Sequence, residues 1–165
     1  MDLDADDVRR LVAAGEGSRV EFKRGLPRAA KVARTLAAFA NTRGGHFLVG
    51  VDDQGRLIGA PRPKEIANEL AMIGVERVDP PLDVAVREIV VDGARVVVGW
   101  VRLSERRPHR VARGAGEFEI PIRIGSSTRS AEGASRRSLE AGAAPRGRGG
   151  LDAFERSVLA WVERQ

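Results

Sequence analysis

The sequence contains no cysteine and no tyrosine, and it has only two histidines, His46 and His109. Without cysteine, the chain has no disulfide bond, no thiolate zinc site and no cysteine nucleophile. Two histidines are too few for a histidine metal cluster, and we expect both to be structural. Any metal ion would therefore depend on carboxylates.

Long apolar runs are also missing. No stretch approaches the roughly 18 to 20 apolar residues of a membrane helix. Residues 1–25 are acidic rather than basic and then apolar, which is not the pattern of a signal or transit peptide. We therefore expect a soluble, cytoplasmic protein without a membrane partner.

Several catalytic motifs are absent. The sequence has no G-x-x-x-x-G-K-[ST] phosphate loop, no G-x-S-x-G elbow and no H-E-x-x-H pair. These absences argue against a P-loop nucleotide-binding protein, a serine hydrolase and a zinc protease of these kinds.

The composition is sufficient for one ordinary core. The chain has 165 residues, of which 42% are hydrophobic and 31% are charged. We expect a domain over residues 1–130, a flexible basic linker over 131–150 that is rich in Ala, Gly, Ser and Arg, and an amphipathic helix over 151–165.

Positive charge is concentrated in one segment. The net charge is +5, and residues 102–148 contain 11 arginines against 5 acids, whereas the rest is close to neutral. Such a surface attracts polyanions, nucleic acid first. Because arginine outnumbers lysine 25 to 3, as GC-rich codon usage also produces, the charge is supporting evidence only.

Periodicity predicts a mixed α/β (α+β) fold with a sheet of five or six strands flanked by helices. Apolar positions three and four apart predict helices over 4–13, 28–40 and 64–73. Alternation or short apolar runs predict strands over 20–23, 46–51, 56–59, 82–90, 96–103 and 118–124, with Asp92-Gly93 as a hairpin turn. Glu21 and Lys23 then share one face of their strand.

Four acids lie near predicted strand ends: Glu16, Glu21, Asp52 and Asp53. Convergent carboxylates in such positions can bind Mg²⁺ or Mn²⁺. From the residues alone an ordinary structural role is equally open, because Glu21 can pair with a cation and Asp52-Asp53-Gln54-Gly55 resembles a plain turn.

Five blocks resemble the Schlafen AlbA-like domain family, in the order in which that family has them. They are EGSRVEFK (16–23), AFANTRGG (38–45), LVGVDDQG (48–55), RPH (107–109) and IRIGSST (122–128). The resemblance implies a nucleic-acid-binding α/β domain. In members that are nucleases it implies a three-carboxylate site that cuts structured RNA, tRNA included.

Carried over by position, this site comprises Glu16, Glu21 and Asp53, with Asp52 as the alternative if the register differs by one. A divalent ion, Mg²⁺ or Mn²⁺, would activate a nucleophile there. Lys23 would stabilise the developing charge, or it is a salt-bridge partner of Glu21. The resemblance thus predicts a metal-dependent endoribonuclease; the alternative is a non-catalytic DNA- or RNA-binding module or transcriptional regulator.

The expected partner is nucleic acid, with tRNA-like RNA favoured over DNA. Because active relatives build their groove from two lobes and this chain supplies one, we expect a homodimer. The few aromatic residues lie mostly on predicted core faces, so we expect no platform for stacking bases. Guanidinium groups suit phosphate, and the candidate contacts are Arg24, Arg28, Arg43, Arg107, Arg110, Arg123 and Arg129.

Overall fold

The structure is a computed structural model, and it describes residues 3–142. Its helices and strands follow one another in the order α1 (Ala5–Ala14), β1 (Val20–Lys23), α2 (Ala29–Thr42), β2 (Gly45–Val49), α3 (Pro63–Arg77), β3 (Ala85–Val91), β4 (Ala94–Val101), β5 (Val111–Gly114), β6 (Glu117–Glu119), β7 (Pro121–Ile124), β8 (Ser127–Ser130) and α4 (Gly133–Glu140).

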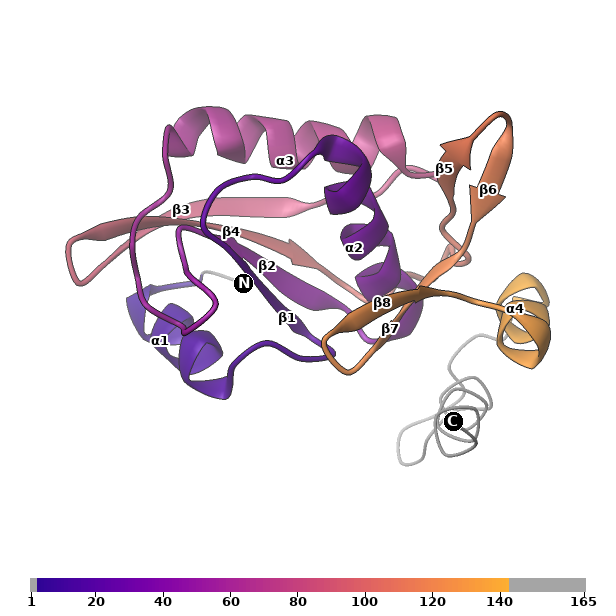
Figure 1. Cartoon of the computed structure of the whole chain (residues 1–165), viewed down its shortest axis with the longest axis horizontal. Helices are drawn as coiled ribbons and strands as arrows, with labels where there is room; N and C mark the ends of the chain where they lie inside the picture. The colour runs from indigo at the N-terminus through magenta and orange to yellow at the C-terminus, as the bar shows by residue number, and fades with distance from the viewer. Residues whose placement is uncertain (1–2, 143–165) are drawn as a thin grey trace.

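A four-stranded mixed sheet forms the centre of the domain, in the order β1-β2-β4-β3 (Figure 1). β1 and β2 are parallel and are connected through α2, whereas β4 is antiparallel to both β2 and β3. β5–β6 and β7–β8 form two separate hairpins. The predicted mixed fold is confirmed, but the main sheet has four strands instead of five or six.

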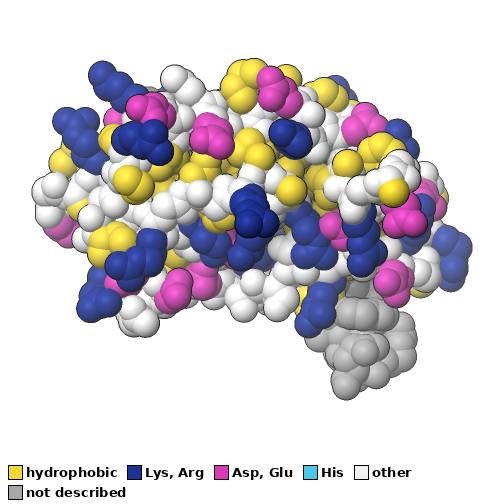
Figure 2. Space-filling model, turned by 45° about the horizontal axis from the view of Figure 1, so that its top comes forward, with side chains coloured by type: hydrophobic (Ala, Val, Ile, Leu, Met, Phe, Trp, Pro, Cys, Tyr) yellow, Lys and Arg dark blue, Asp and Glu magenta, His cyan; other side chains and the backbone are white. Residues whose placement is uncertain are grey.

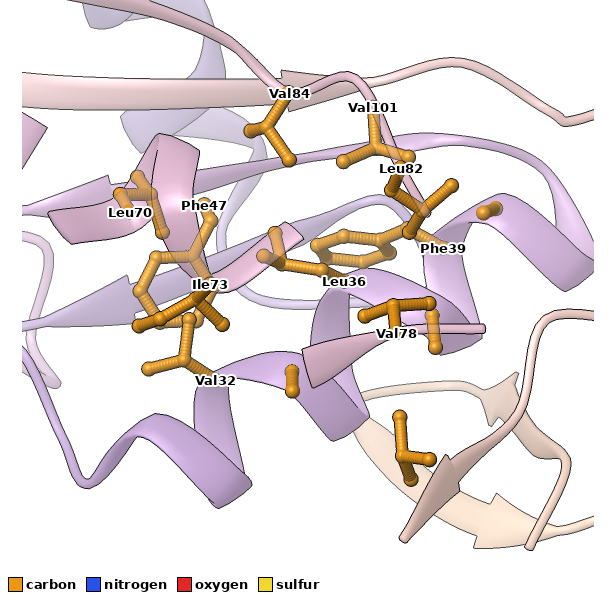
Figure 3. Packing of buried hydrophobic residues seen from close by; sticks show 14 of the residues in the cluster. Val32, Leu36, Phe39, Phe47, Leu70, Ile73, Val78, Leu82, Val84 and Val101 are labelled. Carbon is orange, nitrogen blue, oxygen red and sulfur yellow. The ribbon is translucent and has the colours of Figure 1, made fainter. Parts of the chain in front are cut away.

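Hydrophobic residues fill both faces of this sheet. On one face, α2 and α3 pack over Phe47, Val97 and Val101 (Figure 3). On the other, α1 covers part of a second cluster that includes Leu48 and Val98. The period-two alternation of β2 and β4 thus serves two cores, which is why both strands read as continuous apolar runs.

Acidic side chains begin α1 as the sequence predicts. The Asp4 carboxylate accepts the backbone N–H of Asp7, and the Asp7 carboxylate accepts that of Asp4, which makes a capping box. Asp6 and Asp7 also place negative charge at the positive end of the helix dipole.

Two strand predictions need correction. Residues 56–59 make only an isolated bridge, because the N–H groups of Ile58 and Gly59 both donate to the carbonyl of Gly50 and close a tight loop. The strand expected over 118–124 is interrupted at Ile120. Since Pro121 has no N–H for a continuous ladder, β6 pairs with β5 and β7 pairs with β8.

The stretch 131–150, expected to be a flexible linker, begins with a helix. α4 buries Leu139 against Ile120, Ile122 and Ala131. The rest of that stretch and the helix predicted over 151–165 lie outside the described residues. Among residues 3–142, no helix has both the length and the hydrophobicity required to span a membrane.

Candidate functional site

Glu21 is held between two cations. It lies on β1, in register with Phe47 of β2, and is 8% exposed. Lys23 Nζ donates to its Oε1 at 2.5 Å, and Arg123 Nη2 of β7 donates to its Oε2 at 2.5 Å. The shared strand face predicted for Glu21 and Lys23 therefore places the two side chains in a direct ion pair.

Arg123 is part of the interior and not of the surface. Its side chain is 2% exposed, and its remaining donors reach the carbonyl of Gly17 and the hydroxyl of Thr128, both at 3.1 Å. Its guanidinium also lies 5.3 Å from the centre of the Phe39 ring. In this position Arg123 does not contact phosphate, and it joins β1 to the β7–β8 hairpin instead.

Of the other predicted acids, Glu16 lies close to Glu21, whereas the two aspartates lie on a separate turn after β2. Glu16 Oε1 accepts the backbone N–H of Phe22 at 2.8 Å and lies 3.8 Å from Lys23 Nζ, so one ammonium group pairs with both glutamates. Asp52 is 1% exposed and caps its own turn, where the N–H of Arg56 is the main reason that the pKa of this carboxyl lies below its ordinary value. Asp53 is exposed on the same turn.

This arrangement does not fit a divalent ion. Both oxygens of Glu21 already accept from cations. Within residues 3–142, no group of three or more His, Asp or Glu side chains lies close enough to hold a metal. The Mg²⁺ or Mn²⁺ ion that the resemblance implies stays a prediction.

A second ion pair, in which Glu119 is buried and Arg34 is partly exposed, lies beside the first. Arg34 of α2 donates to Oε1 of Glu119 at 2.6 Å and to the carbonyl of Thr128 at 2.9 Å. Burial raises the pKa of the Glu119 carboxyl, but hydrogen bonds from Arg34 and from the Ser130 hydroxyl outweigh it and keep that pKa below its ordinary value. We call Glu21, Arg34, Glu119 and Arg123 together the α2–hairpin junction.

The predicted phosphate-binding arginines do not form one surface. Arg107 is 8% exposed, and Arg110 pairs with Asp79 at 2.7 Å above the ring of Phe118. Arg43 caps the end of α2, whereas Arg28 caps its beginning. Arg24, Arg28, Arg110 and Arg129 are exposed.

Comparison with known families gives a match to Schlafen, AlbA_2, over residues 16–132, which is most of the chain. The chain belongs to the Schlafen AlbA_2 family. The matched stretch runs from Glu16 to the beginning of α4 and includes every strand. No curated protein matches the chain.

Two solved structures resemble this Schlafen AlbA_2 domain. One is the N-terminal domain of a Nitrosomonas europaea protein described as related to the ATP-dependent DNA helicase RecG, with 29% identity and a TM-score of 0.57 over 77% of this chain and 92% of that one. The other is the DIP2311 protein of Corynebacterium diphtheriae, with 23% identity and a TM-score of 0.55 over 87% of this chain and 29% of that one. The second likeness shows the fold alone.

The AFANTRGG block of this family member has a structural role that sequence reasoning missed. Asn41 is fully buried, and its amide donates to the carbonyls of His109 and Pro121, both at 2.8 Å, while its oxygen accepts the N–H of His109 at 2.7 Å. The Thr42 hydroxyl accepts the N–H of Arg123. An Asn-Thr pair that continues the apolar stripe of a helix is the signal that could have indicated these contacts.

Proposed function

We propose that this Schlafen AlbA_2 domain binds nucleic acid through phosphate contacts made by a basic α2 surface, defined as Arg24, Arg28 and Lys31. All three side chains are exposed. In the described part of the chain, none of the three has a side-chain hydrogen bond or ion pair. Figure 2 shows Lys and Arg side chains in a band across the middle of one face, where they outnumber the acids between them.

The observation that carries the proposal is the first turn of α2. Arg28 stands at the N-cap without a side-chain cap, Lys31 follows one turn later, and the turn contains no acid. Positive side chains interact unfavourably with the positive, N-terminal end of a helix dipole. This unfavourable arrangement becomes favourable when a polyanion lies against the turn.

The carboxylates support binding without cleavage. Glu21 is neutralised by Lys23 and Arg123 and is 8% exposed, so it is placed to hold the fold together. The Nitrosomonas relative, with its described relation to a DNA helicase, is consistent with a nucleic-acid role. Endoribonuclease activity stays the finer prediction of the family resemblance, and the experiment below tests it.

The test measures binding of a labelled RNA hairpin and a matched DNA duplex as a function of salt concentration. The triple variant Arg24→Gln, Arg28→Gln, Lys31→Gln should bind both more weakly, and the slope of log K against log salt should shrink by about 3 because each lost phosphate contact removes about 1. The matched control, Arg95→Gln, removes one charge at the beginning of β4 and should leave the slope unchanged. An unchanged slope in the triple variant would refute the basic α2 surface.

The same samples test cleavage. Wild-type protein and Glu21→Gln are incubated with labelled tRNA in Mn²⁺ and in EDTA. We expect intact RNA in every lane and equal binding in Mn²⁺ and EDTA. Discrete fragments that require both the metal and Glu21 would establish the endoribonuclease instead.

Two further expectations accompany the proposal. RNA of tRNA-like structure is expected to bind more tightly than DNA, which the paired titrations compare directly. A homodimer is expected to provide the second half of a groove, and light scattering of the full chain checks it. A monomer that binds nucleic acid with full affinity would remove the dimer and leave the basic α2 surface intact.

A further inference from the structure

A hollow of about 380 Å³ lies where β2 begins and β4 ends, far along α2 from the basic α2 surface. The rise of an α-helix places Arg28 and Arg43, which cap the two ends of α2, roughly 20 Å apart. The hollow therefore belongs to a different part of the molecule.

Two stacked rings form one wall of this hollow. The antiparallel register pairs His46 with Trp100, and their ring centres are 6.2 Å apart with an angle of 16° between the planes. His46 and Trp100 lie two positions from Leu48 and Val98 on their strands and so share the sheet face that α1 covers only in part. Trp100 is half-buried.

Three arginines complete the lining. Arg19, Arg43 and Arg102 all line the hollow, and its lining includes no Asp or Glu. The Arg102 guanidinium lies 4.8 Å from the centre of the Trp100 ring. A neighbouring hollow of about 460 Å³, which shares Trp100 and Arg102, contains Asp83 in its lining, so the first is the one suited to an anion.

A close backbone approach fixes the arginines relative to one another. A Cβ at Gly44 would lie 2.7 Å from the carbonyl oxygen of Val101, and Gly44 has a φ of +70°. Only glycine suits both conditions, and it allows the turn after α2 to pack directly on the end of β4. Arg43 and Arg102 are thereby brought to the same hollow.

The ring of His46 adds polarity without adding charge. Burial, and next the nearby charge of Arg19, keep the pKa of His46 below its ordinary value, so the ring is neutral at pH 7. Its Nε2 is buried and has no hydrogen-bond partner within the described residues. The positive charge of the hollow therefore comes from arginine.

We propose that this hollow binds a nucleoside phosphate unit, with the base against Trp100 and the phosphate among Arg19, Arg43 and Arg102. Stacking of a base on an aromatic ring contributes about 1 to 3 kcal/mol, and guanidinium groups match phosphate oxygens. The volume is within the usual range for small-ligand pockets. The inference stands independently of the basic α2 surface.

Fluorescence of Trp100 tests the proposal directly. The Trp161→Phe protein has Trp100 as its sole tryptophan, and it is titrated with AMP, with adenosine and with inorganic phosphate. We expect saturable quenching by AMP, with an affinity about tenfold or more above that of either part alone. No change in emission at millimolar AMP would overturn the proposal.

Variants in the same protein identify the site. Arg102→Gln should weaken AMP binding about tenfold by calorimetry, whereas Arg95→Gln, at the opposite end of β4, should leave it unchanged. Trp100→Leu should remove AMP binding. Because Trp100 lies in the sheet, this change can also disturb folding, and Arg102→Gln provides a test that does not depend on the folding of the Trp100→Leu variant. Equal affinities of Arg102→Gln and Arg95→Gln would refute the assignment.

Two probes distinguish the possible sources of the unit. If quenching of Trp100 shows a higher affinity for a 5′-phosphorylated oligonucleotide than for AMP, the ligand is a nucleotide within a strand. If the affinity for AMP is higher, the ligand is a free nucleotide. The Arg28→Gln variant should retain AMP binding in either case. This variant therefore distinguishes refutation of the nucleic-acid proposal for the basic α2 surface from refutation of the nucleotide proposal for the hollow.

Discussion

Arginine has different roles in two regions of α2, because it is paired with acids in one and unpaired in the other. In the α2–hairpin junction, Arg34 and Arg123 are matched by Glu119 and Glu21, and the Arg123 side chain is 2% exposed. At the first turn of α2, Arg28 and Lys31 face solvent with no acid in the turn. Paired, buried arginine stabilises this fold, and unpaired, exposed arginine is left for a partner.

The largest effect on stability is expected from Arg123→Ala, which removes one paired, buried arginine. It leaves the buried Glu21 carboxylate with Lys23 alone, and removing one partner of a buried pair destabilises by about 3 to 5 kcal/mol. Urea unfolding monitored by circular dichroism measures the loss. The double variant Arg123→Ala, Glu21→Gln should recover part of it, because no charge then remains unpaired at that point. A loss in Arg123→Ala below about 1 kcal/mol would show that the pair is dispensable.

Acid should lower the stability of the domain by a smaller amount, through His109. His109 is fully buried beside Asn41, and burial keeps its pKa below the ordinary value of 6.5. As pH falls through about 6.5, the unfolded chain binds a proton before the folded chain does, so stability falls with decreasing pH. One unit below that value the loss is at most about 1.4 kcal/mol.

Urea midpoints at about pH 7.5 and 5.5 check this pH dependence. His46 shifts in the same direction because of its burial, so the His46→Asn variant isolates the contribution of His109. A midpoint that rises on acidification would contradict the sign.

The smallest expected effect comes from reversing the charge of Arg28 at the beginning of α2. Arg28→Asp places a good capping residue at the beginning of α2 and an acid at the positive end of its dipole, so it should raise stability by about 0.5 to 1 kcal/mol. The same variant should bind nucleic acid more weakly. Unfolding and binding titrations of one preparation measure both, and a loss on both counts would mean that Arg28 serves the fold.

Much of the fold was accessible from local pattern. The apolar stripe of α2, the acids before α1 and the Asp92-Gly93 turn predict elements that the structure confirms. Pro121 is a signal for the break at Ile120, but the pairing of each half was not accessible, because the hydrogen-bonding partner of each half is decided elsewhere in the chain.

The candidate site was less predictable, for a physical reason. Neither Arg123 nor Arg28 has an acidic partner that its local sequence reveals, and only the fold brings Glu21 to Arg123 across more than a hundred residues of sequence. Trp100 reads as a core residue because it continues an apolar strand. Its half-exposure follows from where α1 stops covering the sheet, which β4 itself does not encode.

The amide of Asn41 has a consequence for how this domain can be divided. One side chain near the end of α2 makes three hydrogen bonds to His109 and Pro121. A fragment that stops at Arg102, just after β4, retains the four-stranded sheet but leaves this buried amide with neither partner and uncovers the face of α2 that packs against β7. Two-fragment complementation cut at that point should therefore work only when both halves are present, since the second half closes the interior of the first.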